Sequence, residues 1–94
     1  MATFELEITV LATLTLDEHV INVVDDEWRS YLYNLNTPEE IAEHIAYNLL
    51  RGVRLHQLDG WTNQPDNNAR LSITDMWFEQ TQEISDKPTT QPAA

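Results

Sequence analysis

The sequence predicts an α+β fold: a small antiparallel or mixed sheet of about three strands, in the order β-β-α-α-β, with the helices packed on one face. Two observations predict it. Apolar residues recur at every second position from Phe4 to Leu16, which is the period of a strand with one buried face. Residues 38–50 instead carry apolar side chains at helical spacing. A chain of 94 residues buries a single core, so we expect one domain over residues 1–85.

The first expected strand covers residues 4–16, where glutamate and threonine fill most of the polar positions. A second strand is expected at HVINVV, residues 19–24, because this segment is rich in β-branched side chains. A hairpin about Asp17 and Glu18 would join the two. The third strand is expected within residues 69–84, where alternation resumes and both faces become apolar near the end.

The best-defined helix is predicted over residues 37–50. Thr37 is suited to the N-cap, and Pro38 is suited to the first helical position, where its missing N–H costs nothing. Glu40 completes a capping box, and Gly52 supplies the stop. One apolar stripe runs along this helix: Ile41, Ala42, Ile45, Ala46 and Leu49.

The remaining segments are expected to be shorter or irregular. Residues 25–35 are predicted to form a short helix capped by one of their two leading aspartates, with a strand as the alternative. A single helical turn or a structured loop is expected at residues 53–61, and a surface loop at residues 62–68, which carry no apolar side chain. Residues 86–94 have two prolines and no periodicity, which indicates a disordered tail.

Composition excludes several classes of function. Sixteen Asp and Glu against five Lys and Arg give a net charge of −11, which disfavours direct binding to nucleic acid or anionic lipid. The absence of cysteine excludes a disulfide framework and a thiolate zinc site. No stretch reads as a membrane span or a signal peptide, so we expect a cytoplasmic protein.

The chemistry-bearing motifs do not form a recognisable catalytic set. Glu43 and His44 fit part of an inverted zinc-protease motif, but Ile41 stands where its first histidine belongs. Glu40 and His44 lie four apart and could supply two metal ligands, although helix capping explains Glu40 without a metal. We therefore expect no enzyme, no cofactor and no metal, with a metal-dependent hydrolase as the least favoured reading.

The acidic surface is the stronger candidate for function. Glu5 and Glu7 are two strand positions apart, which separates their carboxylates by roughly 7 Å, close to the separation of successive phosphates on a nucleic-acid strand. Further acids could extend this row into a surface that imitates nucleic acid: Asp17, Glu18, Asp25, Asp26 and Glu27. An ordinary solvated acidic face is the alternative interpretation.

Aromatic side chains offer a second candidate surface. Glu43 and Tyr47 share the outer face of the predicted helix, and tyrosine is enriched in interface hot spots. Trp61 follows a turn and precedes a polar loop, so both a contact role and a core role are open to it. We expect Trp28 and Trp77 in the core.

Small size, strong acidity and the lack of cysteine and of a catalytic set resemble accessory proteins of bacteriophages and mobile elements. These include DNA-mimic inhibitors of restriction enzymes or gyrase and anti-CRISPR proteins. EEIAEHIAYNLLRGVRLHQLDGW, residues 39–61, also looks like a segment of uncharacterised phage and bacterial proteins. Neither resemblance transfers a functional residue.

The expected function is therefore a small acidic inhibitor, encoded by a phage, that blocks a host nucleic-acid-binding enzyme by charge mimicry. Its partner would be a protein with a basic surface, in the host cytoplasm. The alternative is an adaptor or antitoxin-like partner that uses the surface around Tyr47 and Trp61. A homodimer stays open as well, because a long edge strand offers unpaired backbone groups to a second copy.

Overall fold

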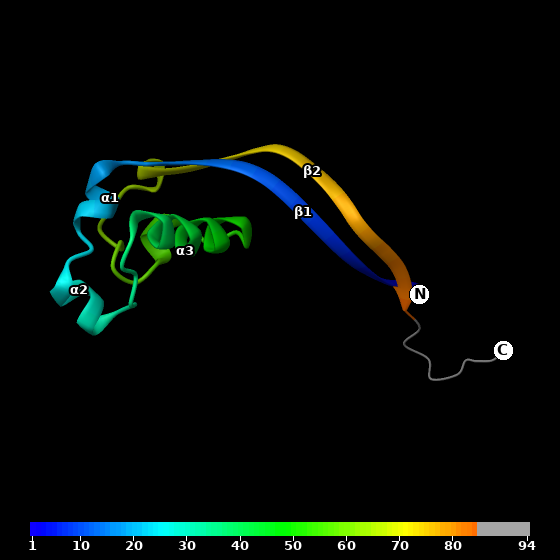
Figure 1. Cartoon of the computed structure of the whole chain (residues 1–94), viewed down its shortest axis with the longest axis horizontal. Helices are drawn as coiled ribbons and strands as arrows, with labels where there is room; N and C mark the ends of the chain where they lie inside the picture. Colours follow the sequence, from blue (N-terminus) through cyan, green and yellow to red (C-terminus); the bar gives the residue numbers. More distant parts are fainter. Residues whose placement is uncertain (85–94) are drawn as a thin grey trace. The chain divides into compact units, whose positions relative to one another are not determined.

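The computed structural model describes residues 1–84 (Figure 1). Two long strands pair in one antiparallel sheet, and every helix lies between them in the sequence. The predicted disordered tail, residues 86–94, lies outside the described residues. In chain order the elements are β1 (Thr3–Leu16), α1 (Glu18–Asn22), α2 (Asp26–Tyr31), α3 (Pro38–Leu50), the 3₁₀ turns η1 (Leu55–Gln57) and η2 (Asp66–Asn68), and β2 (Ala69–Ile84).

The α+β class is confirmed, but the prediction of three strands in the order β-β-α-α-β is not. HVINVV, expected as the second strand, begins as helix α1 instead. The Asp17 side chain caps this helix by accepting a hydrogen bond from the His19 N–H at 3.0 Å. Val20 and Val24, four positions apart, then both reach the core. Burial on a helical face outweighs the strand preference of β-branched residues.

The described residues fall into two compact units, and each is considered by itself. The helical unit comprises residues 13–72, with the three helices and the inner ends of both strands. The ribbon unit comprises residues 1–12 and 73–84, which belong to β1 and β2.

The helical unit is built around one hydrophobic core. Trp61, Ile45, Leu55 and Val20 are its largest fully buried side chains. Ile45 comes from the apolar stripe of α3, as the periodicity predicts. None of the described helices is long and apolar enough to cross a membrane.

The predicted start and stop of α3 are confirmed. Thr37 accepts a hydrogen bond from the Glu40 N–H at 3.1 Å, and Pro38 is the first helical residue. The Glu40 carboxylate reaches back to the Asn36 N–H at 2.6 Å. Gly52 follows the helix with a φ of 86°, the left-handed conformation that glycine adopts most readily.

We expect Thr37→Ala to lower the free energy of unfolding by about 1 kcal/mol, because it leaves the Glu40 N–H without its capping partner. Urea titration followed by far-UV circular dichroism measures the change. Thr62→Ala is the matched control, since Thr62 is exposed and caps no helix. Equal losses in the two variants would contradict a capping role for Thr37.

The ribbon unit has no core of its own. Its strands run antiparallel: the Thr74 hydroxyl donates to the Leu11 carbonyl at 2.9 Å, and the Thr9 hydroxyl donates to the Glu79 carboxylate at 2.9 Å. Every residue from 73 to 84 is exposed. The large apolar side chains of this unit therefore face solvent.

Candidate functional site

Three of the acids predicted to form a partner surface serve the local fold. Asp17 caps α1 and Asp25 caps α2, where the Asp25 carboxylate accepts from the Trp28 N–H at 2.8 Å. Asp26 forms an ion pair with Arg29 at 3.0 Å. Their carboxylates are therefore already partnered within the helical unit.

Two aspartate–histidine pairs stand out in the helical unit. His19 Nδ1 lies 2.7 Å from the Asp17 carboxylate, and His56 Nδ1 lies 2.7 Å from the Asp66 carboxylate, which ties η1 to η2. The hydrogen bonds from these histidines hold the pKa of each aspartate below its usual value. In each pair the backbone N–H of the histidine also donates to the same carboxylate, so the pairs close turns.

The other predicted acids of the helical unit point to solvent. Glu18 and Glu27 are exposed in the first turns of α1 and α2, where a negative charge complements the helix dipole. On α3, Glu43 and Tyr47 are exposed as predicted. The Arg51 guanidinium lies 5.1 Å from the centre of the Tyr47 ring and donates to its hydroxyl at 3.2 Å, which fixes this aromatic on the surface.

Of the two roles left open for Trp61, the structure supports the core role and rules out the predicted place on a contact surface. Its side chain is fully buried, and its indole N–H donates to the Val20 carbonyl at 2.9 Å. Trp28 packs against it at 5.0 Å between ring centres, as expected of a core residue. Trp77, also expected in the core, is instead 42% exposed in the ribbon unit.

His44 does not pair with Glu40 as two metal ligands. The imidazole stacks against Tyr33 at 4.5 Å and Trp61 at 5.9 Å between ring centres, while the Glu40 carboxylate caps α3. The Nε2 atom of His44 is buried with no hydrogen-bond partner among the described residues. Within residues 1–84 no three His, Asp or Glu side chains come together as metal ligands.

Burial lowers the pKa of His44 from its ordinary value of 6.5. The unfolded chain therefore takes up a proton at a higher pH than the folded chain does, so stability is fully present above about pH 6.5 and falls as the pH drops below it. His44→Phe keeps an aromatic ring against Tyr33 but has no group that titrates there. In this variant the free energy of unfolding should decrease less steeply as the pH drops just below 6.5. Urea titrations at a series of pH values measure it, with Tyr47→Phe as the control. An unchanged slope in His44→Phe would rule out His44 as the titrating group.

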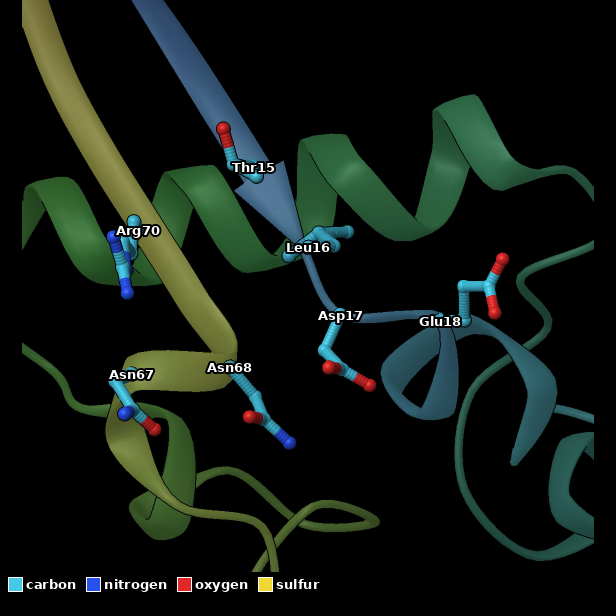
Figure 2. A pocket seen from close by; sticks show the side chains of 7 residues that line it. All are labelled: Thr15, Leu16, Asp17, Glu18, Asn67, Asn68 and Arg70. Atoms are coloured by element: carbon cyan, nitrogen blue, oxygen red, sulfur yellow. The ribbon is translucent and has the colours of Figure 1, made fainter.

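An open cavity of about 560 Å³ lies where β1 ends and β2 begins. Figure 2 shows strand side chains, the start of α1 and the η2 turn around it. Asp17 is engaged by His19, and the Asn68 amide donates to Gln64 at 2.7 Å. The lining combines one cation with two carboxylates and no nucleophile–base pair: Thr15, Leu16, Asp17, Glu18, Asn67, Asn68 and Arg70.

The ribbon unit separates its side chains onto two different faces. The Glu79 carboxylate accepts from the Thr9 hydroxyl at 2.9 Å and from the Trp77 indole at 2.7 Å, so these three side chains share one face. Strand alternation places further carboxylates on the same face. This acidic face carries Glu5, Glu7, Asp75, Glu79 and Glu83.

The opposite side of the ribbon unit is apolar. Alternation from the same two contacts places on this apolar face Phe4, Leu6, Ile8, Met76, Phe78 and Ile84. Glu5 and Glu7 were predicted from the sequence, whereas Asp75, Glu79 and Glu83 were missed. Their alternation with apolar residues was visible, but only the pairing of β2 with β1 shows which face they share.

Comparison with known proteins found no match: no family model, no curated protein and no solved structure is similar to this chain.

Proposed function

We propose that this chain is a small, non-catalytic protein-binding inhibitor that occupies the basic, nucleic-acid-binding surface of an enzyme. The acidic face of the ribbon unit carries the proposal. Five carboxylates lie on that face, and residues 1–12 and 73–84 contain no Lys, Arg or His to neutralise them. A host enzyme that handles DNA or RNA, of the CRISPR-effector, gyrase or restriction type, is the partner class that fits the proposal.

The spacing of the carboxylates supports mimicry of nucleic acid. Glu5 and Glu7 are successive residues on one face of β1, so their carboxylates are roughly 7 Å apart. That separation resembles the separation of neighbouring phosphates. A partner groove with Lys and Arg at phosphate spacing would form charge-assisted hydrogen bonds to both.

The structure also narrows the set of carboxylates available for such binding. Asp17, Asp25 and Asp26 are engaged in caps and an ion pair, so they contribute charge but few new contacts. The carboxylates of Glu18 and Glu27 are exposed and form no hydrogen bond or ion pair with another described residue; the hydroxyl of Ser30 donates only to the backbone carbonyl of Glu27. The helical unit therefore adds long-range attraction, which speeds association at low salt.

Capture from a host lysate, followed by purification of the captured enzyme, tests the proposal. We expect the double variant Glu5→Gln, Glu7→Gln to weaken binding to that enzyme by at least about 10-fold. The control Glu39→Gln, Asp59→Asn removes the same charge from exposed positions of the helical unit and should have a smaller effect.

Two further measurements separate mimicry from other binding modes. Affinity should fall steeply as salt rises, and short duplex DNA should displace the chain from the enzyme. Binding that is insensitive to salt and to DNA, or equal losses in the two double variants, would exclude charge mimicry by this face.

A second candidate function is that of an adaptor whose contact surface centres on Tyr47. The observation that favours it is the exposed Tyr47 ring, 61% accessible and held by Arg51. Trp61 no longer belongs to this surface because it is buried. Tyr47→Ala would then abolish capture while Glu5→Gln, Glu7→Gln would not, and the affinity would depend only weakly on salt.

A further inference from the structure

The apolar face of the ribbon unit has no covering layer in the described chain. Exposed fractions of its side chains run from 39% for Ile84 to 59% for Phe78. The face carries no charged residue, and its polar positions are Thr74, Gln80 and Gln82. Contiguous exposed apolar surface of this kind marks an interface in soluble proteins.

A two-stranded ribbon gains stability when another layer of protein covers one of its faces. An isolated pair of strands is marginally stable in water, because neither face buries apolar surface. The Thr9–Glu79 and Trp77–Glu79 contacts organise the acidic face, but these contacts are exposed. Burial of the opposite, apolar face would supply further stabilisation.

We propose that a second copy of this chain covers the apolar face, so that two ribbon units pack face to face about a twofold axis. In such a dimer, Phe4, Leu6 and Phe78 of one copy pack against the same face of the other. The arrangement is self-complementary, as a twofold interface requires. This inference stands independently of the proposed inhibitory function.

Of the two ways in which a second copy could pair with the ribbon unit, the face-to-face geometry keeps the acidic side chains of the two copies farther apart. Each ribbon unit has five carboxylates and no Lys, Arg or His: Glu5, Glu7, Asp75, Glu79 and Glu83. Stacked sheets lie about 10 Å apart, and the acidic faces point outward on either side of the stack. The two sets of glutamates are then separated by more than the Debye length of about 8 Å at physiological salt, so their repulsion is largely screened. Edge-to-edge pairing would instead leave the apolar faces open and place the charges of both copies on one continuous sheet.

The apolar area that each copy can bury corresponds to a small twofold interface. Six large side chains, each about half exposed, offer at most on the order of 500 Å² per copy if each is given the roughly 150–250 Å² of an aromatic side chain. The dimer would therefore bury at most on the order of 1,000 Å² in total, the minimum for a specific interface.

Sedimentation equilibrium of the full chain over a range of concentrations tests the proposal. We expect a reversible dimer, and we expect Phe78→Glu to weaken it by at least about 100-fold, because it places a carboxylate in the buried face of both copies. Thr81→Glu is the matched control: it adds the same charge three residues away, on the acidic face, and should leave the dimer intact. Near-UV circular dichroism of the buried Trp28 and Trp61 checks that the helical unit is folded in both variants.

Cross-linking gives a second readout that does not depend on a disruptive charge. Because the sequence has no cysteine, a single Leu6→Cys or Glu7→Cys substitution reports on one face alone. A short bis-maleimide linker that spans about 10 Å should join Leu6→Cys into a covalent dimer, because position 6 lies on the stacked inner faces, and should leave Glu7→Cys on the outer face mostly monomeric.

Three results would overturn the proposal. They are a monomer at all concentrations up to about 1 mM, a dimer that tolerates Phe78→Glu as well as Thr81→Glu, and equal cross-linking of both cysteine variants. The first would assign the apolar face to a different protein, and the second would point to pairing of strand edges.

Discussion

Trp61→Ala is expected to remove most of the stability of the helical unit, lowering its free energy of unfolding by about 3–5 kcal/mol. Trp61 is fully buried and packs against Trp28, so truncation leaves a large cavity in the core. It also leaves the Val20 carbonyl without its hydrogen bond from the indole. Total stabilities of small domains are about 5–15 kcal/mol, so the loss is a large fraction of the whole. Urea titration followed by far-UV circular dichroism measures it.

Tyr47→Ala is the control for this substitution. It removes an aromatic ring that is 61% exposed, and its contact with Arg51 lies on the surface, so we expect a loss below about 1 kcal/mol. A small loss in Trp61→Ala, comparable with that of Tyr47→Ala, would contradict the placement of Trp61 in the core.

Gly60→Ala is expected to destabilise the helical unit by roughly 3–5 kcal/mol, for two separate reasons. Gly60 has a φ of 97°, which costs an L-residue about 1–2 kcal/mol. An added Cβ would also lie 2.5 Å from Cζ2 of Trp28, far inside normal contact. The Trp28 ring has little room to move because it packs against Trp61 and Tyr33, so overpacking adds to the cost.

Gly52→Ala separates the two causes. Gly52 has a similar φ of 86°, but an added Cβ there meets nothing within 4 Å. We therefore expect a loss of only about 1–2 kcal/mol, from backbone strain alone. Thermal unfolding of both variants under the same conditions makes the comparison. If the two losses were equal, close packing of Trp28 on Gly60 would play no part in the stability.

The extent to which the fold could be predicted depended on whether the local signals agreed. In α3, Thr37, Pro38 and Gly52 and the apolar stripe all indicate the same helix, and the structure confirms it. In residues 17–24 the signals conflict. β-branched residues favour a strand, whereas Asp17 favours a helix start, and the core contacts of Val20 and Val24 decide for the helix. Those contacts are made with residues far along the chain, which a local pattern does not contain.

Prediction of the candidate site residues was limited in the same way, because a local pattern does not contain contacts with distant residues. Exposure of Glu5 and Glu7 followed from strand alternation within one segment, and the structure agrees. The position of Trp61 could not be read locally, because its burial depends on α1 and α2 closing over it, with partners such as Val20 41 residues away. The contact between Trp77 and Glu79 was missed for a related reason. Alternation along β2 can be read from the sequence, but the exposure of Trp77 depends on whether another layer of the protein covers the strand.

The hydrogen bond from the Asp17 N–H to the Asn68 carbonyl, 2.8 Å long, joins the point where β1 ends to the point where β2 begins. In the unfolded chain these two atoms are ends of a loop of about fifty residues, whose closure carries a large entropy cost. Folding of the helical unit closes that loop, after which the strands can zip together outward from Asp17 and Asn68. From this topology we expect the helices to fold early and the ribbon to fold last. On native-state hydrogen exchange, amides of the outer ribbon should open first, while those of α3 should open only with the whole helical unit.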